Sequence, residues 1–146
     1  MRKPLMIAAA LLVCGCAKAP PPATLMTFEQ ADKPENNDKQ IALEGYPRLP
    51  ARAVLSDSML IELHQDPSDK SKSINFDCNL GGGANQVEKP PRQHTQEDLK
   101  IHGSDGSLII SKDKIRVEGQ LTYWIEKTPP GHNVWLAQPV TIQRLP

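Results

Sequence analysis

The sequence predicts a small all-β domain that closes into a barrel. From Gln40 onward, apolar side chains recur at every second position, which is the spacing of a half-buried strand. No stretch shows a long helical periodicity. Glycines also interrupt the first and the penultimate long strands, at Gly45 and Gly119, and a glycine inside a strand often marks a bulge or a barrel bend. A small two-sheet β-sandwich is the alternative architecture.

Length and charge restrict what the chain can be. Its 146 residues fit one small domain with a tail. The 17 basic and 17 acidic side chains balance, which argues against a strongly cationic nucleic-acid binder. The chain holds 14 prolines and only 4% aromatic residues, so we expect many loops and a modest core.

The N-terminus has the pattern of an export signal. Arg2 and Lys3 give a positive start, and residues 5–13 (LMIAAALLV) form an uninterrupted apolar run. A membrane-spanning helix needs about 20 residues, so this run is too short to span and fits the secretory pattern instead. A signal peptide is therefore predicted over residues 1–15.

The apolar run ends in Val13-Cys14-Gly15-Cys16, which resembles the lipobox of bacterial lipoproteins. The resemblance implies that the Cys16 thiol receives a diacylglyceryl group, that the signal is cut before Cys16, and that the new amino group is acylated in many species. Two or more acyl chains attach a protein stably to a membrane. Ala17 stands where an Asp would resemble an inner-membrane retention signal, so the expected address is the outer membrane, facing the periplasm.

Residues 16–38 are predicted to be a disordered, lipidated tether before a domain that spans residues 39–146. Pro20–Pro22 favour an extended polyproline conformation, which acts as a semi-rigid spacer. The apolar cluster at residues 25–28 leaves two further interpretations open. The first is that it forms a helical turn or docks on the domain, and the second is that the tether is a partner-binding segment.

Five long strands and two short ones account for the domain. The long strands are predicted at Ile41–Tyr46, Met59–His64, Ser73–Leu80, Lys114–Ile125 and Val134–Ile142, and the short ones at residues 99–101 and 108–110. Thr95 is expected to cap one short helical turn. Cys78 shares the apolar parity of its strand, so we expect it to be buried as a small hydrophobic residue.

The order of these elements carries a second resemblance. Three strands, an irregular link over residues 81–98, the phrase DKIRVEG at 113–119 and a final hairpin look like an OB-fold, a five-stranded Greek-key barrel. The phrase is similar to the penultimate strand of many OB domains, including small bacterial envelope ones. The resemblance covers about residues 39–146. The link departs from it, because three glycines and two prolines stand where an OB domain often carries a helix.

Two tryptophans are the main candidate binding residues. Trp124 and Trp135 fall on the polar parity of their strands, and a hairpin centred on Pro129–Pro130 would make them direct cross-strand neighbours on the outer face. Three roles are open for such a pair. It can stabilise the hairpin, by about 0.2–1 kcal/mol, or it can be covered by the tether. It can also form a docking patch for a protein, glycan or peptide. Arg116 and Lys114 lie further along the same face and would give the patch a polar rim.

Residues that carry catalysis or hold metals are sparse. The four histidines lack the spacing of metal ligands and are expected at the surface. The glycines at 81–83 are not followed by the Lys-Ser/Thr of a phosphate-binding loop. No Ser-His-Asp set is readable, so no enzyme, cofactor or metal site is predicted.

The sequence therefore predicts a lipid-anchored envelope protein that presents an OB-like barrel as a non-enzymatic binding or assembly module. The expected partners are the membrane, through lipid on Cys16, and an envelope protein or glycan. Oligonucleotide or oligosaccharide binding, as in other OB domains, is the alternative; for nucleic acid, the near-neutral charge and the periplasmic address oppose it. A small metal-dependent enzyme is opposed by the missing ligand set. The fold alone does not decide among these functions.

Overall fold

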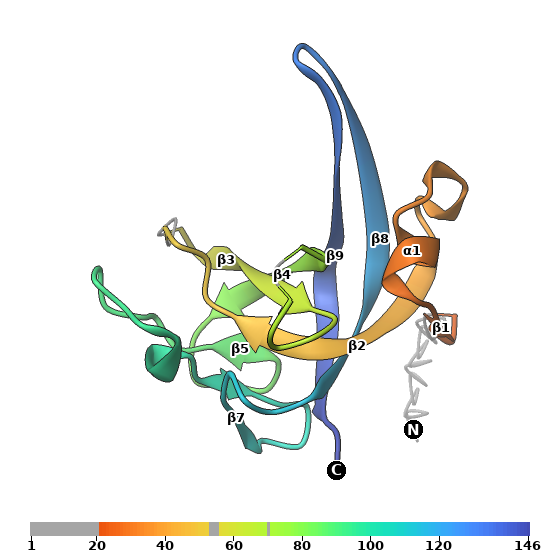
Figure 1. The fold of residues 1–146 in the computed structure, drawn as a ribbon. Coiled ribbons are helices and arrows are strands. Elements are labelled where there is room, and N and C mark those ends of the chain that lie inside the picture. Colours follow the sequence, from red (N-terminus) through yellow and green to blue (C-terminus); the bar gives the residue numbers. More distant parts are fainter. Residues whose placement is uncertain (1–20, 53–55, 70) are drawn as a thin grey trace, which may run out of the picture.

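The computed structural model describes residues 21–52, 56–69 and 71–146 (Figure 1). The long strands are β2 (Gln40–Arg48), β3 (Ser58–His64), β4 (Ser73–Leu80), β8 (Ile115–Lys127) and β9 (Pro130–Arg144). The short strands are β1 (Thr24–Leu25), β5 (Gln86–Val87), β6 (Ile101–His102) and β7 (Leu108–Ile109). Three single helical turns complete the described chain: α1 (Phe28–Ala31), η1 (Pro34–Asn36) and η2 (Gln96–Asp98). No helix in the described ranges is long and apolar enough to cross a membrane.

The five long strands pair in a closed circuit. β2 pairs antiparallel with β3 and with β8, β3 pairs antiparallel with β4, and β8 pairs antiparallel with β9. The circuit closes where β9 lies parallel to β4, with Asn75 beside Trp135 and Phe76 beside Leu136. All strands belong to one sheet, so the small all-β, OB-like fold is confirmed and the two-sheet sandwich is not formed.

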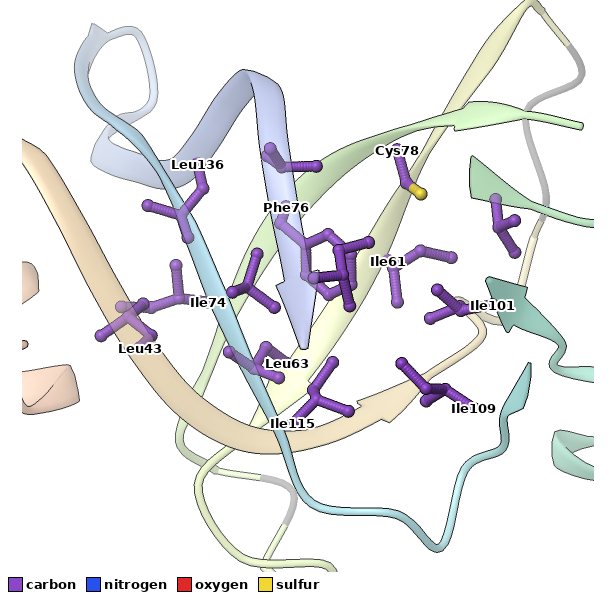
Figure 2. Packing of buried hydrophobic residues seen from close by; sticks show 14 of the residues in the cluster. Leu43, Ile61, Leu63, Ile74, Phe76, Cys78, Ile101, Ile109, Ile115 and Leu136 are labelled. Carbon is purple, nitrogen blue, oxygen red and sulfur yellow. The ribbon is translucent and has the colours of Figure 1, made fainter. Parts of the chain in front are cut away.

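The core lies inside this circuit and follows the predicted alternation (Figure 2). In β4, Ile74, Phe76 and Cys78 are buried while the residues between them are partly exposed. Phe76 is fully buried and lies near Ile61 of β3 (Figure 2). Alternate residues of every long strand point inward because successive side chains of a strand face opposite sides.

A bulge interrupts the pairing of β8 with β9. Glu118 lies opposite Thr141, but Gln120 lies opposite Ala137, so residues 138–140 all face Gly119. A bulge of this kind bends the strand and increases its twist. Beyond it, residues 120–137 continue as a hairpin that reaches well past the other strands, and we name it the projecting hairpin (Figure 1).

The predicted tether is wrong from Thr24 onward, because these residues pack against the barrel. β1 pairs in parallel with β2, Thr24 beside Ile41. The single turn of α1 begins at a Thr27 capping box and buries Phe28, which is only 6% exposed. We call residues 24–39 the N-terminal segment. Phe28 is buried in the core cluster, which explains why this segment docks on the barrel. Docking was one of the interpretations left open for the apolar residues 25–28. Residues 16–20 lie outside the described part.

The link between β4 and β8 is irregular, as the sequence predicts. It contains β5, β6 and β7, which pair in series, and the η2 turn capped by the Thr95 side chain. β5 also pairs with the end of β4. The link therefore covers one end of the barrel with short strands where an OB domain often has a helix.

Candidate functional site

A groove of about 710 Å³ lies on the outer face of β3, β4 and β9, and we call it the outer groove. The connection from β2 to β3 contributes Pro50, Arg52 and Ser56 to one wall. Asn133 and Trp135, from the projecting hairpin, contribute to the other side. The groove thus joins an open sheet face to the connection between β2 and β3 and to strand β9 of the projecting hairpin, close to the strand face and loops that OB domains use for ligands.

Strand register places the floor of the outer groove. Leu60 of β3 pairs with Asp77 of β4, and Glu62 pairs with Asn75 in the next row. The parallel join then sets Trp135 beside Asn75. Leu60 is 45% exposed although it is large and apolar. An indole, an aliphatic side chain, an amide and two carboxylates therefore share one surface.

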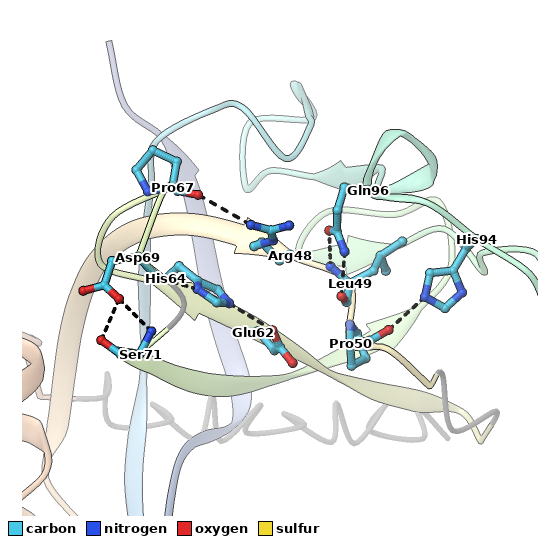
Figure 3. A network of polar contacts seen from close by, with 10 residues as sticks. All are labelled: Arg48, Leu49, Pro50, Glu62, His64, Pro67, Asp69, Ser71, His94 and Gln96. Carbon is cyan, nitrogen blue, oxygen red and sulfur yellow. Dashed lines mark hydrogen bonds and ion pairs between the residues drawn. The ribbon is translucent and has the colours of Figure 1, made fainter.

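Glu62 is oriented by a buried histidine (Figure 3). His64 Nε2 lies 2.9 Å from Glu62 Oε2, and His64 Nδ1 lies 3.4 Å from the Asp69 carbonyl oxygen. His64 is only 3% exposed, so the expectation of surface histidines is wrong at this position. The loop that joins β3 to β4 covers the imidazole ring, and its Asp69 carbonyl oxygen faces Nδ1.

The wall of the outer groove is attached to the link that precedes β6 (Figure 3). The Leu49 N–H donates to Gln96 Oε1 at 2.8 Å, and Gln96 Nε2 donates to the Leu49 carbonyl at 2.9 Å. His94 Nε2 lies 2.8 Å from the Pro50 carbonyl oxygen. These contacts fix the start of the β2–β3 connection beside the groove.

The loop that covers His64 is ordered by two aspartate turns. Asp66 accepts hydrogen bonds from the Ser68 hydroxyl and N–H, and Asp69 accepts the same pair from Ser71. The side-chain hydrogen bond from serine, followed by the backbone one, holds the pKa of each carboxyl below its usual value. Both carboxylates are exposed, so they shape the loop and do not form a reactive pair.

The two tryptophans share the outer face but are not direct neighbours, so that part of the prediction is wrong. Trp124 lies opposite Asn133, and Trp135 lies opposite Thr122. If the register that pairs Glu118 with Thr141 continued past the bulge, Trp124 would lie directly opposite Trp135. The bulge shifts β9 by two residues, and the turn is formed by Thr128 and Pro129, because Lys127 pairs with Pro130.

The indoles therefore form a diagonal pair across the β8–β9 ladder. Diagonal neighbours in an antiparallel sheet lie about 7–8 Å apart between Cα atoms, within reach of aromatic side chains. Trp124 is 60% exposed on the projecting hairpin, while Trp135 is half-buried and lines the outer groove.

Arg116 lies on the half of β8 below the bulge and Lys114 directly precedes that strand, and the charges of both meet Glu44 of β2. Arg116 donates to Glu44 Oε1 from Nε at 3.0 Å and from Nη2 at 2.6 Å. Lys114 Nζ lies 3.9 Å from Glu44 Oε2. Neither residue lines the outer groove, so the structure does not bring them together with the tryptophans.

The remaining sequence candidates lie elsewhere. Cys16, the predicted lipidation site, falls outside the described residues. Cys78 is buried, and burial, with a smaller contribution from Asp77, raises the pKa of its thiol to about 12. In the part of the chain that the structure describes, no group of three or more His, Cys, Asp or Glu side chains has the arrangement of a metal site.

Sequence reasoning missed most of the outer groove. Leu60 carried a signal, since it is a large apolar residue on the outward parity of β3. Asn75 and Asp77 also have outward parity, but polar residues are ordinary there. Their approach to Trp135 depends on the pairing of β4 with β9, which no local pattern reports.

Comparison with known proteins adds little to this description. No protein-family model matches the chain, and no curated protein matches it. Among solved structures, it is similar to a crystal structure described as an aspartyl-tRNA synthetase from Leishmania major Friedlin, with a TM-score of 0.43 and 16% identity over 94% of this chain. The chain spans 23% of that protein, and a similarity this weak carries no argument about function. The fold and the groove define a small all-β, OB-like domain with a ligand-sized cleft on its outer face.

Proposed function

We propose that this chain is a lipid-anchored cell-envelope protein whose OB-like barrel is a non-enzymatic binding module, with the outer groove as its binding site. The address rests on the lipobox-like Val13-Cys14-Gly15-Cys16 and on Ala17, which favour the outer membrane and the periplasm. In this proposal the lipid on Cys16 holds the barrel beside the membrane, where it meets a glycan or another envelope protein.

One observation carries the binding proposal. The outer groove exposes Leu60 and presents Trp135 among polar side chains on a rigid sheet. Small-ligand sites are concave and combine apolar surface with a few placed polar groups. The volume of about 710 Å³ lies within the range of roughly 300–1,000 Å³ typical of such sites.

The non-enzymatic part of the proposal rests on the chemistry of the groove. Glu62 is held by His64, while Asp77 lies beside Leu60 in the ladder. The histidine that contacts Glu62 is only 3% exposed, and in the described contacts neither carboxylate touches a serine, threonine or cysteine side chain that could act as a nucleophile. The groups are placed for hydrogen bonding and stacking.

Photocrosslinking in cells tests the proposal. A benzoylphenylalanine replaces Leu60 in the full lipidated chain, and a matched variant carries it at Leu108, which is similarly exposed, at 47%, on β7. We expect a discrete adduct from position 60 that position 108 does not give. Equal labelling at both positions, or none at position 60 in correctly localised protein, would contradict binding at the outer groove.

A further inference from the structure

We propose that the occupant of the outer groove is an uncharged, hydroxyl-rich glycan chain; this inference rests on the proposed function and specifies its ligand. Three properties of the groove lead to it. They are the mixture of charges, the hydrogen-bonding groups around one indole, and the second indole along the hairpin.

The charges in the groove disfavour strongly charged ligands. Glu62 and Asp77 are acidic, and Arg52 on the wall is basic. Among the described residues, no cation forms an ion pair with Asp77. A polyanion would bring its phosphates against two carboxylates, whereas single-strand nucleic-acid binding needs a positive groove. A strongly cationic chain would meet Arg52, although the two carboxylates outnumber it. The lining thus carries charges of both signs, and a neutral ligand is recognised there through hydrogen bonding and stacking rather than through net charge.

The groups around Trp135 suit a sugar ring. The indole offers a flat apolar face, and Asn75, its neighbour in the ladder, offers an amide that both donates and accepts. Glu62 and Asp77 supply acceptors, and Arg52 supplies donors. A pyranose has an apolar C–H face for stacking and hydroxyl groups at its edge that donate and accept. Both parts of such a ring find partners in the groove.

The second indole indicates a chain rather than a single sugar. Trp124 lies diagonally across the ladder from Trp135 on the same outward face, and Asn133 lies opposite Trp124 and lines the groove. With 60% of its surface exposed, Trp124 is open to a ligand that continues from the groove onto the projecting hairpin. Stacking sites in a row are typical of sites for linear polymers.

Calorimetric titration of the purified, lipidated full chain in detergent tests this inference. The probes are the neutral hexasaccharides of N-acetylglucosamine and of glucose, with the matching disaccharides, a thymidine oligonucleotide and an oligolysine peptide. We expect saturable binding to at least one hexasaccharide and at least tenfold weaker binding to its disaccharide. If neither hexasaccharide binds, the inference is overturned. Tighter binding to the oligonucleotide or to oligolysine also overturns it.

Variants locate the bound glycan. Trp135→Ala and Asp77→Asn are each expected to weaken binding at least tenfold, which corresponds to about 1.4 kcal/mol. Trp124→Ala should weaken the hexasaccharide but not the disaccharide. Leu108→Ala and Glu118→Gln, which lie outside the groove, should leave affinity unchanged. Asp77→Asn keeps the shape of the side chain, so it reports on recognition even if Trp135→Ala unfolds, and unaltered affinity in Asp77→Asn counts against the proposal.

This experiment separates the inference from the proposed function. If position 60 gives a crosslink but no glycan binds, the glycan inference fails, while the proposed binding module stands with a different ligand. Loss of the position-specific crosslink would remove the binding site itself. Glycan binding that survives both Trp135→Ala and Asp77→Asn would place the sugar elsewhere on the protein and reject the groove.

Discussion

Asp32 and His132 connect parts of the chain that lie 100 residues apart, with His132 Nε2 at 2.6 Å from Asp32 Oδ1. Tyr123 stacks on the His132 ring at 4.9 Å between centroids, and the Tyr123 N–H donates to Asn37 Oδ1 at 2.8 Å. The N-terminal segment therefore holds the base of the projecting hairpin, and with it the position of Trp124.

Replacing Asp32 with Ala should loosen the projecting hairpin without unfolding the barrel. Both partners are exposed, and surface ion pairs contribute about 0–1 kcal/mol. We expect a change below about 1 kcal/mol in the free energy of unfolding, with faster amide exchange in residues 123–134. Glu35→Ala, an exposed acid of the same segment, is the control. Unchanged exchange in Asp32→Ala would show that the pair does not restrain the hairpin.

Phe28→Ala tests whether the N-terminal segment is part of the folded domain. Truncating a buried Phe costs about 3–5 kcal/mol, and Phe28 is 6% exposed in the core cluster. Denaturant unfolding should show a loss in that range. Leu25→Ala, at a residue that is 54% exposed, should change stability by less than about 0.5 kcal/mol. Equal, small effects of both changes would mean that the segment acts only as a spacer.

Gly45→Ala should destabilise the barrel because β2 passes very close to β3 there. A Cβ on Gly45 would collide with the backbone carbonyl of His64, and a backbone group cannot rotate away. Overpacking of this kind costs about 1–3 kcal/mol. A Cβ on Gly131, in the projecting hairpin, meets nothing within 4 Å. Thermal unfolding should therefore separate the two variants, and a Gly45→Ala protein as stable as Gly131→Ala would contradict the close approach.

Cys78 should be unreactive in the folded protein and should make stability fall at high pH. Burial raises the pKa of its thiol from about 9 to about 12, so in that interval the unfolded state ionises while the folded state does not. The contribution is thus fully present below about pH 9 and is lost as pH rises toward 12. Thiol labelling of the lipidated chain at neutral pH should require denaturant. A Cys78→Ala variant should lose the extra alkaline sensitivity; rapid labelling of the native protein would contradict burial.

Cys16→Ala should release the protein from membranes, since the proposed anchor is lipid on that thiol. Cys14→Ala is the matched control, because it removes the other cysteine of the lipobox-like motif and keeps Cys16. Cell fractionation and the mass of the native chain measure the outcome. A Cys16→Ala protein that stays with the membrane, or an unprocessed wild-type chain without acyl mass, would reject the anchor.

Local alternation was enough to predict the five long strands and the part of the core that they supply. Ile74, Phe76 and Cys78 are buried as their spacing indicates, because the two-residue period of a strand appears directly in the sequence. The short turn after Thr95 was also predictable, because its cap consists of hydrogen bonds between residues that are close in the sequence.

Features that depend on distant pairing were not predictable. The offset of Trp124 from Trp135 arises from the bulge in which residues 138–140 face Gly119. Gly119 indicates a bulge or bend at this place in the sequence, but not the two-residue shift of β9 that moves the indoles apart. Docking of Phe28 competes with a proline-rich flank that favours an extended chain. The outer groove needs β4 and β9 side by side, and some 60 residues separate Asn75 from Trp135 in the sequence.

The parallel contact of β9 with β4 also restricts when this protein can fold. It joins the middle of the chain to one of its last elements, and contacts between residues so far apart in sequence slow folding. During synthesis the ring of strands stays open until Leu136 has left the ribosome. The circuit of long strands therefore cannot be completed for almost the whole of translation, because its last contact is made by one of the last strands to be synthesised.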